Sequence, residues 1–110
     1  MKYSSTRGLS SPVSSSEAII AGLAPDGGLY IPDEIPSVSM DQIAELCKAD
    51  YATRSAEILS LFLTDFTKEE LLGFTRAAYA SDRFTSPDGA APVVKIGRNE
   101  YVLELFHGPS

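Results

Sequence analysis

Three copies of one helix-start pattern constrain the fold of this chain more than any other feature. In each copy a Ser or Thr precedes a Glu or Gln by three residues, as in Ser14–Glu17, Ser39–Gln42 and Thr67–Glu70. The hydroxyl of such a pair accepts a hydrogen bond from a free amide of the first turn, and the longer side chain bonds back to the capping residue's amide. Apolar residues at helical spacing follow each copy, so the sequence predicts a helix after each one.

The helical spacing predicts four helices in all, over residues 15–23, 40–48, 51–63 and 68–81. On the fourth we expect an inward apolar face made of Leu71, Leu72, Phe74, Ala78 and Tyr79. Cys47 falls on the second helix, where a lone cysteine is most simply a small buried residue.

Short apolar segments outside the helices predict strands at residues 2–6, 29–31, 93–96 and 101–106. The last two strands are separated by Gly97-Arg98-Asn99, which suits the turn of a β-hairpin. Residues 82–92 are polar and hold Gly89 and two prolines, which predicts a loop. The expected fold class is therefore α/β with α+β character, in which short strands and about four helices form one domain of 110 residues.

The charge balance and the scarcity of Cys and His narrow the classes of function. Nine Lys and Arg stand against fifteen Asp and Glu, a net charge of −6, which is unfavourable for binding nucleic acid or an anionic membrane. The apolar runs are far shorter than the roughly 18 residues of a membrane span, and the N-terminus lacks the apolar stretch of a signal peptide. We therefore expect a cytoplasmic protein. The single Cys47 and single His107 argue against a metal site.

Two segments combine residue types that bind ligands. Residues 22–32 contain Pro25-Asp26-Gly27-Gly28, which is either a plain turn or a place where glycines admit another backbone or a ligand. Residues 104–110 are either a solvated strand exit or a loop whose His107 and Ser110 face a ligand. A Ser-His-acid triad of Glu104, His107 and Ser110 is set aside, because residues so close together near a chain end do not converge as a triad normally does.

The last apolar strand is followed at once by His107-Gly108-Pro109-Ser110, where the sequence stops. Leu105 and Phe106 would then lack apolar cover. We therefore expect residues 1–110 to be the N-terminal domain of a longer protein, packed against the rest of the same polypeptide.

Three motifs occur along the chain in a specific order. They are Tyr3-Ser4-Ser5-Thr6-Arg7-Gly8, the segment from Glu17 to Pro32 that includes Ala24-Pro25-Asp26-Gly27-Gly28, and Glu104-Leu105-Phe106-His107-Gly108-Pro109. In these motifs the chain resembles the N-terminal region of threonine synthase. The resemblance implies a fold-type-II pyridoxal-phosphate enzyme that converts O-phospho-L-homoserine and water to L-threonine and phosphate.

The resemblance also implies roles for residues near both ends of the chain. Gly108 and Ser110 are candidates for cofactor binding, and His107 and Arg7 for contact with the substrate phosphate. In the family the lysine that holds the cofactor follows the Gly-Pro turn, beyond this chain, so no complete catalytic set is assigned. The lysines present do not match that motif; they are Lys2, Lys48, Lys68 and Lys95. Ser110 stands where the family usually has threonine.

Three functions remain open on the sequence. The first is the N-terminal domain of a threonine synthase, inactive by itself. The second is the same domain of a pyridoxal-phosphate-dependent phospholyase, which would give a keto acid and ammonia. The third is a standalone interaction module that uses Leu105 and Phe106 as a docking patch.

Overall fold

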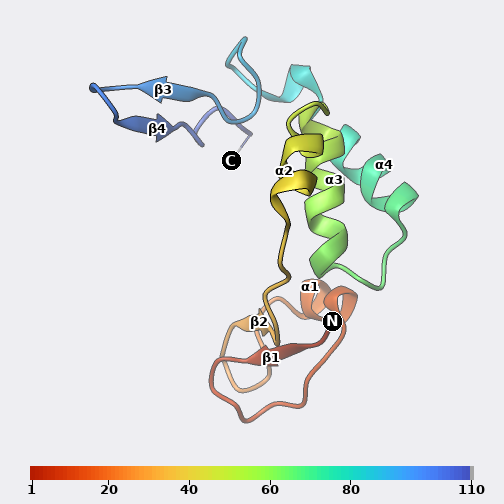
Figure 1. The fold of residues 1–110 in the computed structure, drawn as a ribbon. Helices are drawn as coiled ribbons and strands as arrows, with labels where there is room; N and C mark the ends of the chain where they lie inside the picture. Colours follow the sequence, from red (N-terminus) through yellow and green to blue (C-terminus); the bar gives the residue numbers. More distant parts are fainter. Residues whose placement is uncertain (110) are drawn as a thin grey trace.

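The computed structural model describes residues 1–109 and has the mixed α/β character expected from the sequence (Figure 1). Its α-helices are α1 (Ser15–Ala21), α2 (Met40–Leu46), α3 (Tyr51–Phe62) and α4 (Lys68–Ala78). Each helix begins at the predicted residue and ends one to three residues earlier than predicted. Within residues 1–109 every helix is too short or too polar to cross a membrane.

The three predicted helix starts are confirmed in atomic detail. At α1 the Ser14 hydroxyl accepts from the Glu17 amide at 3.3 Å, and the Ser14 amide donates to Glu17 Oε2 at 2.8 Å. The same reciprocal bonds are present at the starts of α2 and α4. A fourth cap was not predicted: Asp50 accepts from the Thr53 amide at 2.8 Å and begins α3. The helix starts are therefore set by contacts within three residues.

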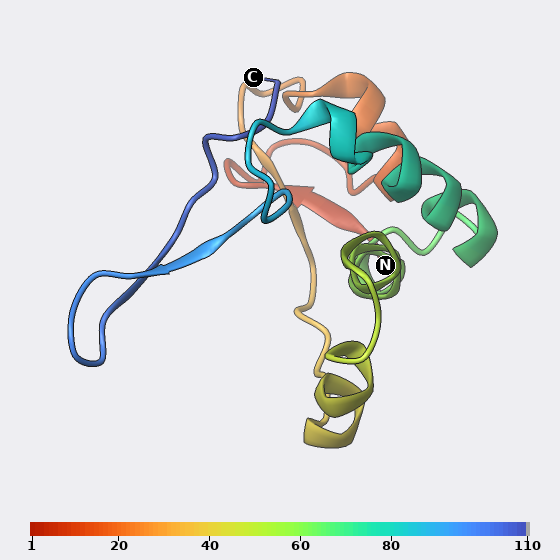
Figure 2. The same ribbon diagram turned by 90° about the horizontal axis from the view of Figure 1, so that it is seen from above.

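The strands pair as two separate antiparallel sheets. β1 (Tyr3–Ser5) pairs with β2 (Tyr30–Pro32), and β3 (Val93–Lys95) pairs with β4 (Tyr101–Leu103). The predicted hairpin is thus confirmed, although β4 ends three residues before the predicted end at 106. Figures 1 and 2 both show this hairpin extending away from the helices.

The small core lies between α3 and α4, which run side by side (Figure 1). Leu71 is 2% exposed, and Thr75 is buried next to it and donates its hydroxyl proton to the Ala52 carbonyl at 2.9 Å. The β1–β2 sheet is tied to these helices by the Tyr3 hydroxyl, which donates to the Phe62 carbonyl at 3.1 Å. This hydrogen bond holds the N-terminal sheet against the C-terminal end of α3.

Three expectations about single segments are wrong. On α4 only Leu71 of the predicted inward face is buried, and Phe74 is 56% exposed, because the Phe66 ring, 6.0 Å away between centroids, covers only part of it. Cys47 is exposed, since it lies at the last turn of α2 rather than beneath it. A short 3₁₀ helix, η1 (Ser81–Arg83), begins the segment predicted as loop.

Candidate functional site

The end of β4 carries the clearest cluster of polar side chains near the C-terminus. His107 Nε2 lies 2.6 Å from Glu104 Oε2, and the His107 side chain is only 15% exposed. The sequence left open whether His107 lies at a solvated strand exit or faces a ligand. In the structure the imidazole is largely buried and meets Glu104, because the chain turns after β4 and brings the two side chains together. The triad with Ser110 stays untested, since Ser110 is not among the described residues.

Residues 84–85, in the loop after η1, contact His107 and Gly108 as well. Thr85 Oγ1 lies 3.2 Å from His107 Nδ1, and the Thr85 amide donates to the His107 carbonyl at 3.0 Å. The Phe84 ring packs against Gly108, where a Cβ would lie 3.3 Å from the nearest ring carbon. His107 and Gly108 are thus clamped between β4 and the loop after η1.

Arg7 is not part of this cluster. It follows β1, and Figure 1 shows that sheet at the opposite end of the molecule from the C-terminus. Arg7 Nη1 donates to the Asp26 carbonyl at 2.9 Å, so the guanidinium lies over the glycine turn. Ser110 lies outside the described residues. The structure therefore brings together His107 and Gly108 and places Arg7 elsewhere.

The glycine turn at residues 24–28 is organised by Asp26. Its Oδ1 accepts from the Ser5 hydroxyl at 2.6 Å and from the Gly28 amide at 2.9 Å, and its Oδ2 accepts from the Leu9 amide at 3.0 Å. A Cβ on Gly28 would collide with the Ser5 hydroxyl. The space that a side chain at Gly28 would need is therefore taken by the hydroxyl groups of Ser5 and Thr6, which belong to the β1 segment and the residue after it.

The electrostatics of Asp26 follow from these bonds. The Ser5 hydroxyl, and after it the amides of Gly28 and Leu9, lower the pKa of Asp26 from 3.8 to about 2, against a smaller opposing effect of desolvation. Hydrogen bonds that favour the charged form of a carboxyl act in this direction. Asp26 is therefore an ionised structural acceptor, and a proton is held there only in strong acid.

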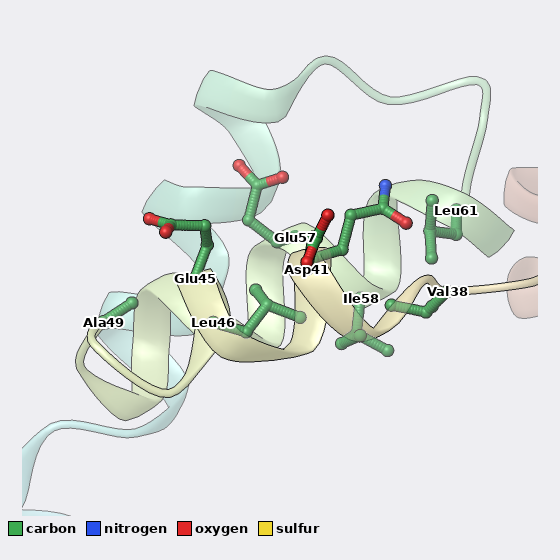
Figure 3. Close-up of a pocket in the computed structure, with 9 residues that line it drawn as sticks. Val38, Asp41, Glu45, Leu46, Ala49, Glu57, Ile58 and Leu61 are labelled. Carbon is green, nitrogen blue, oxygen red and sulfur yellow. The ribbon is translucent and has the colours of Figure 1, made fainter.

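An apolar groove lies between α2 and α3 (Figure 3) and has a volume of about 410 Å³. Its floor includes Leu46 and Ile58, and its rim carries Asp41, Glu45 and Glu57. Two of these carboxylates already pair with lysines, Glu45 with Lys48 at 2.6 Å and Glu57 with Lys68 at 2.8 Å. A groove rimmed by carboxylates disfavours a phosphate ester, because like charges repel.

The sequence missed Thr85, Phe84 and Asp26 as members of these clusters. Thr85 and His107 are 22 residues apart, and the polar loop around Thr85 has no local pattern that indicates a partner. Asp26 did carry a signal, since Asp before Gly-Gly commonly accepts from the amide two residues ahead. Within the described range no group of three His, Cys, Asp or Glu side chains is arranged to hold a metal ion.

A family model described as threonine synthase N terminus matches residues 2–79 of the chain. Threonine synthase from Corynebacterium glutamicum is 37% identical over 115 residues, which cover all of this chain and 24% of that protein. The chain thus spans about a quarter of the length of the curated relatives it matches.

Two solved structures resemble the fold closely. A pyridoxal-phosphate-bound threonine synthase from Brucella melitensis has a TM-score of 0.84 and 40% identity, over 99% of this chain and 23% of that chain. Threonine synthase from Escherichia coli has a TM-score of 0.81 and 37% identity, over 99% of this chain and 24% of that chain.

Proposed function

The chain belongs to the threonine synthase N-terminal family, and from this premise we propose that residues 1–110 are the first domain of a longer cytoplasmic, pyridoxal-phosphate-dependent lyase. The whole protein converts O-phospho-L-homoserine and water to L-threonine and phosphate. The domain has no activity alone, and its partner is the rest of the same polypeptide.

One observation carries this proposal: within residues 1–109 the apolar side chains of the β3–β4 hairpin, of Leu105 and of Phe106 are exposed. All six residues of β3 and β4 are exposed, and Leu105 and Phe106 are 72% and 71% exposed. An isolated two-stranded hairpin is marginal in water, and strands of this composition are normally buried. Such a hairpin is suited to lie against further parts of a larger enzyme, which agrees with the quarter of each relative that the chain spans.

The described residues do not fit pyridoxal phosphate as a complete site. Lys48 and Lys68 are paired with glutamates at the surface, and Lys95 lies over the Tyr101 ring at 6.0 Å from its centroid. No lysine among residues 1–109 joins the cluster around His107. The group that would bind the cofactor covalently is therefore supplied by the remainder of the protein, and no step of the reaction is assigned to this chain.

Within that larger enzyme, the chain would contribute the turn after β4 to the rim of the site. We assign Gly108 and Ser110 to contact with the cofactor and His107 to contact with phosphate or to orientation of the loop. Arg7 is the second candidate for contact with the substrate phosphate. One of its guanidinium nitrogens already donates to the Asp26 carbonyl, which leaves the other nitrogens for a phosphate.

The test is an assay of the full-length protein with pyridoxal phosphate and O-phospho-L-homoserine. We expect phosphate and L-threonine in equal amounts, measured by a phosphate dye assay and chromatography. The 110-residue chain, assayed in parallel, should release neither.

The other outcomes distinguish the alternatives. Phosphate released with a keto acid and ammonia would show a phospholyase. Turnover by the 110-residue chain would contradict its role as an incomplete domain. No phosphate release by the full-length protein would withdraw the enzyme activity and leave the interaction module.

A further inference from the structure

We propose that Thr85 and Glu104 are positioning residues, which hold the His107 imidazole between them and so fix the Gly108–Pro109 turn. The inference rests on the proposed function, because the turn matters only if it lies at the rim of an enzyme site. It concerns two side chains, Thr85 and Glu104, that the sequence did not assign to any role at that site.

The first support is the complementary chemistry of the three side chains. An ionised Glu104 can only accept, so His107 Nε2, at 2.6 Å from it, carries a proton and donates it. In the neutral imidazole Nδ1 is then an acceptor, and the Thr85 hydroxyl lies 3.2 Å from it and 3.5 Å from the His107 carbonyl, so that it can donate to either acceptor on His107. Both ring nitrogens are thus satisfied, and the ring has one preferred orientation.

The second support is the backbone. The last backbone hydrogen bond between the two sides of the hairpin runs from the Glu104 amide to the Pro92 carbonyl, at 2.9 Å. Beyond that point the chain is tied back by the Thr85 amide, which donates to the His107 carbonyl at 3.0 Å. Side-chain and main-chain bonds therefore join the same two segments, residues 84–85 and 107–108.

The third support is an inverted pattern of burial. The His107 and Glu104 side chains are 15% and 26% exposed, whereas Leu105 and Phe106 between them are more than 70% exposed. Burial normally follows the opposite order, with apolar side chains inside. In this segment the hydrogen bonds to His107 and the Phe84 ring against Gly108, rather than the Leu105 and Phe106 side chains, hold the chain in place.

The variant that tests the inference is Thr85→Val, which keeps the shape of the side chain and removes its hydroxyl. Thr85→Ser restores the hydroxyl and is the rescue variant. Ser86→Ala is the matched control in the same loop, since the Ser86 hydroxyl accepts only from the Asp88 amide among the described bonds. Glu104→Gln tests the other side of the ring by removing the charge while keeping an acceptor.

Two measurements are made on the full-length protein. Hydrogen exchange of the peptide covering residues 104–109 should be about fivefold faster in Thr85→Val, because the contacts of the Thr85 hydroxyl with His107 are lost. Titration with pyridoxal phosphate and steady-state kinetics should show about a tenfold weaker cofactor affinity or a tenfold higher KM, since small displacements of positioned groups have large effects. Thr85→Ser and Ser86→Ala should match the wild type, and Glu104→Gln should fall between.

Unchanged exchange and unchanged cofactor and substrate constants in Thr85→Val would overturn the inference. A fall in melting temperature with the same constants would also overturn it, because it would show a purely structural role. The exchange measurement does not depend on turnover. A wild type without activity would therefore refute the proposed enzyme function while the clamp on His107 is still tested.

Discussion

At the scale of single residues, the carboxylate of Asp26 joins three separate segments of the chain by hydrogen bonds. Asp26 joins the β1 segment through Ser5, the following loop through Leu9, and its own turn through Gly28. Ser5 is itself buried, at 6% exposure, so its hydroxyl needs this acceptor. The turn keeps its shape because three donors converge on one charged group.

This arrangement predicts a dependence on pH for the substitution Asp26→Asn. The pKa of Asp26 is lowered to about 2, so its stabilisation is complete above the ordinary value of 3.8 and is lost as the pH falls through about 2. The difference in melting temperature between wild type and Asp26→Asn should be largest above about pH 4 and shrink toward pH 2. Thermal unfolding of both full-length proteins by circular dichroism measures it. A difference that stays constant down to pH 2 would mean that the charge of Asp26 contributes nothing.

At the scale of elements, the local sequence determines where each α-helix starts more strictly than where it ends. Each helix start has a side-chain cap within three residues, whereas the ends of α2 and α4 have no glycine to stop them. Gly22 ends α1 with a φ of 70°, a conformation that glycine adopts without strain. The helices therefore begin where the sequence predicts, whereas every end, including that of α1, lies one to three residues before the predicted one.

Two glycines in different elements should respond oppositely to the same substitution. Gly73 lies inside α4 with open space around its Cβ position, so Gly73→Ala should raise the free energy of unfolding by about 0.5–1 kcal/mol. Gly28 lies in the Asp26 turn, where a Cβ would also lie 3.0 Å from Asp26 Oδ1 and Thr6 Oγ1. Gly28→Ala should lower the free energy of unfolding by about 1–3 kcal/mol.

Urea denaturation of the two full-length variants measures both changes. Gly73→Ala serves as the control for Gly28→Ala, because each adds a single methyl group. A loss of stability in Gly73→Ala would show that this face of α4 packs against another part of the protein. Equal effects at both positions would contradict the close approach at Gly28.

At the scale of the whole molecule, the chain exposes more surface than a compact domain. Its accessible surface is 7852 Å², against roughly 5,900 Å² for a compact monomer of this mass. Its radius of gyration is 16.5 Å, against roughly 13 Å for a compact domain of this length. Exposed apolar side chains occur on α1, α2, α4 and both hairpin strands. Such a surface is typical of a part that packs against a larger body.

The isolated 110-residue chain should therefore bind an apolar dye that the full-length protein does not. We expect a strong rise in anilinonaphthalene sulfonate fluorescence with the isolated chain, because Leu105, Phe106 and the hairpin are exposed. The double variant Leu105→Ser with Phe106→Ser should reduce the rise and serves as the control. Equal dye binding by the isolated chain and the full-length protein would contradict the packing of this surface in the larger enzyme.

The sequence by itself determined the helix starts, the hairpin and the family. Caps and hairpin turns depend on a few neighbouring residues, so a local pattern suffices to predict them. The family was recognisable because its motifs, such as Phe106-His107-Gly108-Pro109, are contiguous in the chain. Burial was harder to predict: the apolar face of α4 was expected to be buried from its spacing and Cys47 from its residue type, yet among these residues only Leu71 is buried.

Only the tertiary structure decided which polar groups meet. Thr85 and His107 are 22 residues apart, and Ser5 and Asp26 are 21 residues apart, so no local spacing indicates either contact. Each contact forms because helices and strands between the two residues fold the chain back on itself. The position of a side chain relative to a distant one depends on the sum of all intervening packing, and for that reason the clamp on His107 became visible only in the folded chain.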